Sequence, residues 1–442
     1  MTILNRKEAR AILEKVVALS KADGCEANLN GSNSGNIRYA RNSVSTAGVT
    51  EDISLVVQCN FGKKVGTATI NEFDDASLAK VVARAEETAR LAPESPEFMP
   101  VLGPQKYDES DAFVTATAAI KPQYRAKAAA ASIGPARDKD ATAAGFLTDT
   151  ASFSAMMNSE GLFAYHTSTN VNLTVTVRTN DGTGSGWASS DDNDVRRLDV
   201  EATSGVALNK AIASREAKAL EPGKYTVILE PNAAAELIGR MFFSFGARQA
   251  DEGRSFLAKK GGGTRKGEQV FDKRVSVYSD PLDERVPAGT WTPSGEPVSK
   301  MDIIKNGVVE NLFYDRYWAD KQGVDSVPQP NNLIMVGGDK TQEELIKNTE
   351  RGILVSRLWY IRALDPQTQL YTGLTRDGTF YIEDGEIKYP VKNFRFNESP
   401  VIMLNNLEEL GRGKRVSVFG FPVVMPPMKI REFTFSSLSD AV

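Results

Sequence analysis

The chain of 442 residues contains a single histidine, His166, and only two cysteines, Cys25 and Cys59. One histidine excludes every site that needs two imidazoles, so a zinc site built on a histidine pair cannot form within this chain. Two cysteines are too few for a CxxC zinc module and too sparse for a secreted disulfide framework. We therefore expect free thiols and a cytoplasmic protein.

An excess of positive charge and a long apolar run are also missing. Lys plus Arg total 53 against 57 Asp plus Glu, a formal net charge of −4, which does not recruit nucleic acid by bulk electrostatics. No apolar run approaches the roughly 18 to 20 residues that cross a bilayer, and the N-terminus does not read as a signal peptide. We expect neither nucleic acid nor a membrane among the partners.

The first half of the sequence predicts helices around an antiparallel sheet. Asn5 and Glu8 have capping-box spacing at the start of an apolar stripe, and residues 74–92 and 122–137 carry further helical patterns. Residues 37–70 and 143–188 alternate β-branched and polar side chains, with glycines at the turns, which indicates antiparallel strands. A helix over about 198–218 is expected to close this region.

Glu221-Pro222-Gly223 predicts a domain boundary. The fold class is therefore α+β, with an N-terminal α+β domain (residues 1–220) and a C-terminal β-rich domain (residues 221–442). The second domain is expected to begin with a strand at 225–229 and a helix over 233–250, followed mostly by strands and by one helix near 341–350. Its apolar segment 419–428 contains three prolines, which favour an edge strand at a subunit interface, with ordinary core as the alternative.

Several chemically suggestive residues have simpler explanations. His166 lies in a strand-like stretch, where a structural role is expected rather than catalysis. Two acidic groups could offer oxygen ligands to a hard cation, but neither has EF-hand spacing, and solvated loops are the preferred interpretation. These groups are Asp191, Asp192 and Asp194, and Asp280, Asp283 and Glu284.

Two glycine-rich runs, residues 181–187 and 259–267, do not have the pattern of phosphate-binding loops. The first opens no helix, and the second lacks the Gly-Lys-Ser/Thr ending. We interpret both as flexible loops at a cleft, with Trp187 packing against a ligand or a neighbouring chain.

Longer motifs run through both halves in a consistent order. They include RYARNSVST, the turn NSEG, RSFLAKK, NLFYDRYWAD, PQPNNLIMVGG and YIEDGEIKYPVKNFRF. In these motifs nearly the whole chain resembles the TldD/TldE (PmbA) family, peptidase family U62, whose members were once called modulators of DNA gyrase.

The resemblance implies a metallopeptidase framework whose zinc ligands are lost in this chain. In the catalytic subunit of that family a helix carries HExxxH, and a C-terminal Cys supplies a third ligand. The corresponding positions here are Gly239, Arg240 and Ser244, and residues 411–428 contain no Cys. The chain is thus most similar to the TldE/PmbA-type subunit, and the resemblance implies no catalytic residue, metal or cofactor in this chain.

The implied function is that of a non-catalytic subunit in a complex that degrades or matures unfolded or flexible peptides. Zinc is then expected only in a TldD-like partner, and the chain alone is expected to form a homodimer. A self-assembling peptide-binding protein without proteolytic activity is the alternative, and independent peptidase activity is a weaker one. Arg240, Arg248, Arg254 and Trp187 are candidates for a peptide cleft or partner contact, with packing and a solvated helix face as the other interpretation.

Overall fold

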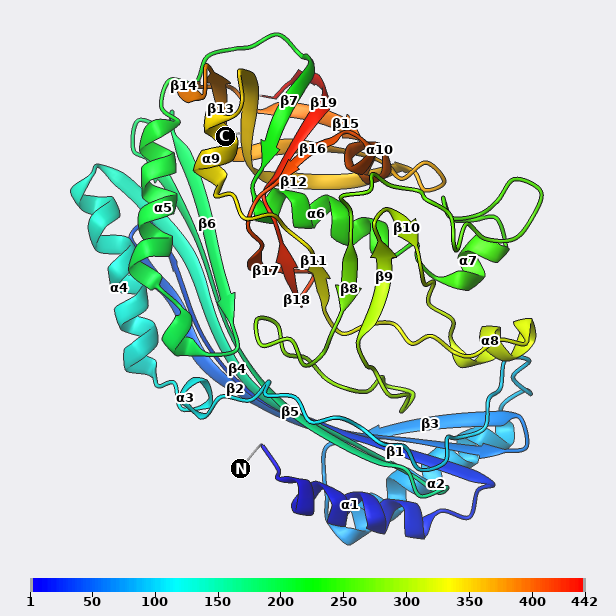
Figure 1. The fold of residues 1–442 in the computed structure, drawn as a ribbon. Helices are drawn as coiled ribbons and strands as arrows, with labels where there is room; N and C mark the ends of the chain where they lie inside the picture. The colour runs from blue at the N-terminus through cyan, green and yellow to red at the C-terminus, as the bar shows by residue number, and fades with distance from the viewer. Residues whose placement is uncertain (1–2, 440–442) are drawn as a thin grey trace.

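The computed structural model describes residues 3–439, and its first half is built on one antiparallel sheet in the order β3-β2-β1-β4-β5-β6. Four of the strands have 17 to 19 residues and curve into a long trough (Figure 1). The strands are β1 (Gly24–Ala40), β2 (Ser43–Phe61), β3 (Lys64–Ile70), β4 (Ala141–Asn158), β5 (Phe163–Thr179) and β6 (Ser185–Asp192).

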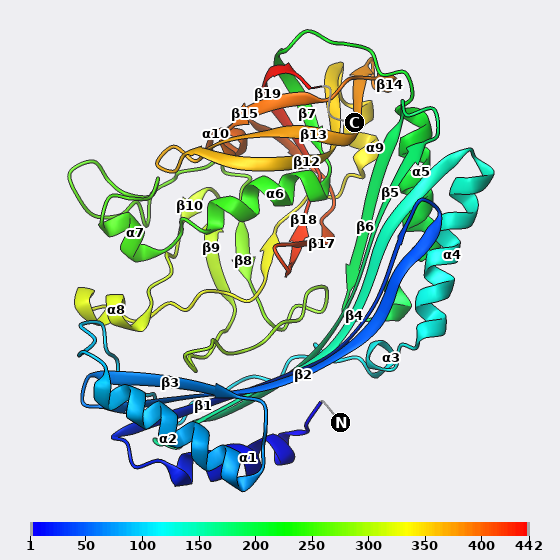
Figure 2. The same ribbon diagram turned by 180° about the vertical axis from the view of Figure 1, so that it is seen from behind.

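Helices cover the convex face of this sheet, as Figure 2 shows from behind. Two hydrophobic clusters lie beneath them, one under α4 and α5 and the other under α1 and α2. The predicted capping box is confirmed, because the Asn5 side chain accepts from the Glu8 backbone N–H while the Glu8 side chain accepts from the Asn5 N–H. The helices are α1 (Arg6–Leu19), α2 (Asp75–Leu91), α3 (Thr115–Ala118), α4 (Pro122–Asp138) and α5 (Val200–Ala213), with a 3₁₀ turn η1 (Val195–Arg197).

Alternation along the strands decides which side chains meet these helices. In β5 the odd-numbered Val171, Leu173, Val175 and Val177 are buried in the cluster under α4 and α5. Successive side chains point to opposite faces, so the even-numbered residues of the same strand lie on the concave face. The sequence thereby gives the trough an apolar outer surface and a polar inner one.

The second half contributes two further sheets that sit over the concave side of the trough (Figure 1). The first has the order β10-β9-β8-β11-β18-β17, and the second has the order β12-β7-β19-β15-β13-β14 with β16 paired to β19. The strands are β7 (Gly223–Leu229), β8 (Val277–Ser279), β9 (Met301–Lys305), β10 (Val308–Val309), β11 (Leu333–Met335), β12 (Arg351–Asp365), β13 (Leu370–Glu383), β14 (Glu386–Pro390), β15 (Phe394–Glu398), β16 (Leu407–Leu410), β17 (Lys414–Val418), β18 (Phe421–Met425) and β19 (Met428–Leu438).

Helix α6 (Pro231–Phe242) packs against strands of both C-terminal sheets and buries most of its residues in the largest hydrophobic cluster. Four shorter helices complete the described part of the C-terminal half. They are α7 (Ala247–Asp251), α8 (Arg316–Gln322), α9 (Gln342–Lys347) and α10 (Pro400–Asn405). The α+β fold class and the strand-rich second half are confirmed, whereas α8 and α10 were not predicted.

Two predicted elements were wrong in detail. The expected helix over 233–250 is interrupted, because residues 245–247 leave the helix to exchange backbone hydrogen bonds with Phe313. The apolar segment 419–428 contains β18, which has neighbours on both sides and is not an edge strand. Pro422 is accommodated since β11 pairs only with Val423 and Val424, beyond the proline.

The two halves are joined by buried polar contacts. Lys210 Nζ on α5 lies 2.7 Å from Oε2 of Glu230, the residue that precedes α6 in the chain. Ser185 Oγ on β6 donates to Asp377 Oδ1 at 2.5 Å. Cys25 and Cys59 face each other across β1 and β2 as buried free thiols, as predicted. No helix within residues 3–439 is long and apolar enough to cross a membrane.

Candidate functional site

Helix α6, which carries Gly239 and Arg240, faces the hairpin of β17 and β18. A Cβ atom added at Gly239 would lie 3.2 Å from Cγ1 of Val418 and 3.5 Å from Cε2 of Phe419. Arg240 places its guanidinium 4.7 Å from the centre of the Phe419 ring and 3.2 Å from Glu236 Oε2. Aliphatic and aromatic groups therefore occupy the space beside Gly239.

The tip of this hairpin is held in a specific conformation. Phe419 and Gly420 both have positive φ, 53° and 81°, as a type I′ turn requires. A left-handed conformation is unfavourable for a bulky residue, at a cost on the order of 1 to 3 kcal/mol, and persists only where surrounding contacts enforce it. Phe243, whose ring centre lies 5.4 Å away, and Arg240 provide those contacts.

Ser244 lies beyond the end of α6, in the turn before α7. Its hydroxyl accepts a hydrogen bond from Gln369 Nε2 at 2.9 Å. Because Gly239 has no side chain, Arg240 is a cation and Ser244 is engaged elsewhere, these three residues do not fit a zinc ion. Residues 3–439 contain no group of three or more His, Cys, Asp or Glu side chains arranged to hold a metal.

Two large cavities meet at the hairpin tip. One, of about 570 Å³, lies between the trough and the C-terminal half, and we call it the trough cavity. The other, of about 530 Å³, adjoins the end of α6 and is lined by four phenylalanines, so we call it the aromatic cavity. Phe421, Pro293 and Asn331 line both, so the two cavities are direct neighbours, and we refer to the pair as the continuous cleft.

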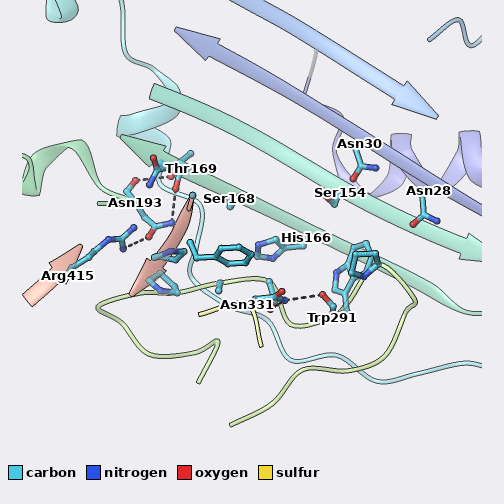
Figure 3. Close-up of a pocket in the computed structure, with 18 of the residues that line it drawn as sticks. Asn28, Asn30, Ser154, His166, Ser168, Thr169, Asn193, Trp291, Asn331 and Arg415 are labelled. Atoms are coloured by element: carbon cyan, nitrogen blue, oxygen red, sulfur yellow. Dashed lines mark hydrogen bonds between the residues drawn. The ribbon is translucent and has the colours of Figure 1, made fainter. Parts of the chain in front are cut away.

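Apart from Arg415, which is paired with Asp191, the labelled residues that line the trough cavity are uncharged and can form hydrogen bonds (Figure 3). Asn30, Ser154 and His166 stand opposite one another on β1, β4 and β5 and therefore share the concave face. Asn331 closes the other side by donating to the carbonyls of Gly289 and Trp291 at 2.7 and 3.1 Å. Amide and hydroxyl groups can both donate and accept, so this surface suits a ligand with many uncharged polar groups.

His166 is the one titratable imidazole of the cleft. Burial lowers the pKa of His166 below its ordinary value, so the ring is neutral near pH 7. Gly289 of the covering loop approaches the ring closely, because a Cβ there would lie 3.6 Å from His166 Cδ2. The imidazole has no hydrogen-bond partner among residues 3–439, so any structural role of His166 comes from packing in the cleft.

We interpreted the two acidic groups as solvated loops, but most of their side chains are paired. Asp191 is buried on β6, where its Oδ1 accepts from Arg415 Nε at 2.9 Å and its Oδ2 accepts from Asn170. Asp194 and Asp283 each accept two or more hydrogen bonds from nearby arginines, Arg196 and Arg285. The solvated-loop interpretation was wrong for Asp191, because its partner Arg415 comes from the other half of the chain, 224 residues away.

The predicted arginines do not form one cluster. Arg248 is bound by Glu97 and Glu252, and Arg254 also pairs with Glu252, whereas Arg240 pairs with Glu236. None of the three lines either cavity of the cleft.

Trp187 on β6 is half-buried and stacks its ring 4.6 Å from the guanidinium of Arg357. The glycine-rich residues 182–183 line a separate cavity of about 330 Å³ between the two halves. Neither feature belongs to the continuous cleft.

The cleft residues that sequence reasoning missed are mostly uncharged. Asn28, Asn30 and Ser154 belong to no motif, Glu296 lies in a short turn, and Asn331 lies in the motif PQPNNLIMVGG but was not singled out as a site residue. The sequence signal that could have indicated these residues is the period-2 alternation in β1, β4 and β5, which places polar side chains on the face opposite the apolar one.

Comparison with known proteins agrees with this architecture. Three models of the PmbA/TldA metallopeptidase family match: domain 1 at residues 25–89, the central domain at 114–218 and the C-terminal domain at 222–437. The crystal structure of TldE from Thermococcus kodakarensis has a TM-score of 0.86 at 19% identity, covering 97% of this chain and 99% of that one. At that identity the likeness establishes the fold.

Curated relatives carry metalloprotease names. Metalloprotease PmbA of Escherichia coli O157:H7 is 22% identical, covering 97% of this chain and 98% of its own. A protein named metalloprotease from Methanothermobacter thermautotrophicus is 24% identical over 296 residues, and this match spans 61% of the present chain and only 62% of that relative.

The fold and the matches define a metallopeptidase-type protein of α+β class. Because the three family models together span most of its length, the chain belongs to the PmbA/TldD/TldE family.

Proposed function

We propose that this chain is a non-catalytic subunit of the TldE/PmbA type, acting in the cytoplasm. It assembles with a zinc-bearing TldD-like subunit into a peptidase for unfolded or flexible peptides. The observation that supports this proposal is the packing at Gly239, where Val418 and Phe419 fill the space beside α6.

The surroundings of α6 support a role without bound metal. Arg240 carries a positive charge at the position of the family's glutamate, and charge repulsion opposes a cation there. Ser244 and the Cys-free hairpin supply no substitute ligand. What the chain retains is the cleft, which can form one wall of a substrate chamber.

Zinc content and peptidase activity test the first part of this proposal. The purified chain should hold less than about 0.1 zinc per chain after dialysis and should cleave no unfolded peptide, since it lacks the ligands and the general base. About one zinc per chain together with chelator-sensitive cleavage would contradict it.

Co-purification tests the second part. Tagged chain from its native host should recover a second chain that carries HExxxH, and the mixture should cleave unfolded peptides. Light scattering should report a homodimer of the isolated chain at micromolar concentration, as a specific interface of roughly 1,200 Å² or more would maintain. A monomer both with and without that partner would overturn assembly.

Peptide binding without proteolysis is the second candidate. The continuous cleft favours it, because its cavities of about 570 and 530 Å³ are large enough for several residues of an extended chain. This alternative is supported if the chain binds peptides and its native host provides no partner that carries HExxxH.

A further inference from the structure

The aromatic cavity has the composition of a cation site. Its charged lining residues are Glu296 and Asp315, and no Lys, Arg or His lines it. Aromatic faces attract cations through the ring quadrupole, and carboxylates accept charge-assisted hydrogen bonds from them. The aromatic walls are Phe242, Phe243, Phe313 and Phe421.

Glu296 is only half paired. Its Oε2 accepts a hydrogen bond from Ser294 Oγ at 2.9 Å, whereas the buried Oε1 has no partner among residues 3–439. The residue as a whole is only 8% exposed, so bulk water does not compensate the missing donor. A buried carboxylate oxygen without a donor is unfavourable, which makes a donor from outside the chain stabilising.

The turn that carries Glu296 is fixed by backbone contacts. The Thr292 N–H donates to the Glu296 carbonyl at 2.9 Å, and the Glu296 N–H donates to Thr292 Oγ1 at 3.1 Å. Tyr107 Oη, from the N-terminal half, donates to the Gly295 carbonyl at 2.7 Å. These contacts fix the backbone of the turn, and Ser294 is the side chain that holds one oxygen of the Glu296 carboxylate.

Nearby arginines do not supply the missing donor. Arg248 lies next to the lining residue Gln249 but is engaged by Glu97 and Glu252. Arg316 follows Asp315 and directs its Nη2 to the carbonyl of Pro100 at 2.7 Å.

We propose that the aromatic cavity binds the cationic group of a peptide, an ammonium or guanidinium, with Glu296 as the acceptor. Oε1 is the acceptor that the chain leaves without a donor, and the phenylalanines enclose the alkyl part of the ligand. This inference rests on the proposed role in peptide handling and adds a preference for basic peptides. The cation comes either from a Lys or Arg side chain or from the peptide's amino terminus.

Calorimetric titration of the full chain with matched decapeptides tests the inference. The peptides carry either Lys or norleucine at one central position in an otherwise uncharged sequence, each with a free or an acetylated amino terminus. The Lys peptide, or the free-amine peptide, should bind about tenfold more tightly than its neutral counterpart. If the cation is a side chain, the acetylated Lys peptide binds more tightly than the acetylated norleucine peptide. If it is the amino terminus, the norleucine peptide with a free amine binds more tightly than its acetylated form.

Glu296→Gln is the diagnostic variant, because it removes the charge and keeps the size and the contact with Ser294. It should reduce the preference to less than about twofold, with an unchanged thermal midpoint showing that it is folded. Glu201→Gln, on an exposed position of α5, removes the same charge outside the cleft and should keep the full preference.

Equal binding of charged and neutral peptides, a preference that survives in Glu296→Gln, or no binding of any peptide would each overturn the inference. Assembly with an HExxxH subunit is decided separately by co-purification, so the two proposals can fail independently.

Discussion

Gly239 illustrates how single residues define the chemistry of this chain. The absence of a side chain there lets Val418 and Phe419 approach α6, and the adjacent Arg240 binds the ring of Phe419. A histidine introduced at position 239 would therefore require the hairpin to move. The missing side chain at Gly239 and the packing of the hairpin are two parts of the same local structure.

His166 gives a prediction on pH dependence. Burial lowers its pKa in the folded chain, whereas the unfolded chain titrates near pH 6.5. The unfolded state thus binds the proton more readily, and the free energy of unfolding should fall as the pH decreases from about 6.5 through the folded pKa. Urea midpoints between pH 8 and 5 should show this decrease in the native sequence and a shallower one in His166→Gln.

The comparison of the native sequence with His166→Gln also controls for the other buried groups that titrate. Burial raises the pKa values of Glu26, Glu236 and Glu398, which has the opposite effect because their stability contribution is lost as the pH rises. These groups are present in both proteins, so the difference between the two pH curves isolates His166. Since it is the only histidine, proton NMR of the single imidazole should report a pKa below 6.5 directly, and a value above that would contradict the prediction.

At the level of elements, strand alternation and close helix packing fix the trough. Gly66 on β3 lies directly under α2: a Cβ there would lie 2.1 Å from the Ala89 backbone nitrogen and 2.3 Å from the Ala85 carbonyl oxygen. Gly66→Ala must push strand and helix apart, because backbone atoms cannot rotate away. We expect a loss of about 3 kcal/mol in unfolding free energy, measured by urea denaturation.

Gly48→Ala is the matched control for this prediction. Gly48 also lies in a strand of the same sheet, but a Cβ there meets nothing within 4 Å. The variant should be neutral or slightly stabilising, since alanine restricts the unfolded chain more than glycine does. Equal effects of the two substitutions would show that the close approach of α2 is not responsible.

At the scale of the whole molecule, the contact between the halves creates the cleft. Arg415 on β17 donates to Asp191 of β6 and to Asn193, the residue after that strand, and is itself buried with Asp191. Arg415→Ala would leave a buried carboxylate without its cation, at a cost of about 3 to 5 kcal/mol. We propose that the halves are separate domains joined near residues 221–223, so this variant should also loosen their association.

Limited proteolysis measures that effect. Cleavage between residues 214 and 223, yielding two stable fragments, should be several-fold faster in Arg415→Ala than in the native sequence. Lys414→Ala, on the exposed neighbouring residue, should leave the rate unchanged. Fragments that instead divide near residue 300 would contradict the proposed boundary.

The sequence alone determined the local helices and strands, and it excluded a site built on a pair of histidines. Capping residues and apolar stripes predicted α1, α2 and α4, and alternation predicted the long strands, because these signals act between residues close in the chain. The resemblance of motifs identified the family, which the family models confirm. One histidine and two cysteines already excluded a conventional zinc site.

The tertiary structure decided everything that depends on distant partners. The helix over 233–250 breaks because Phe313 offers backbone hydrogen bonds, and β18 is central because β11 joins it from 90 residues earlier in the chain. Asp191 is a buried ion-pair partner only because Arg415 reaches it from the other half. The cleft follows the same principle: its walls come from both halves of the chain, and no local pattern records which polar faces meet.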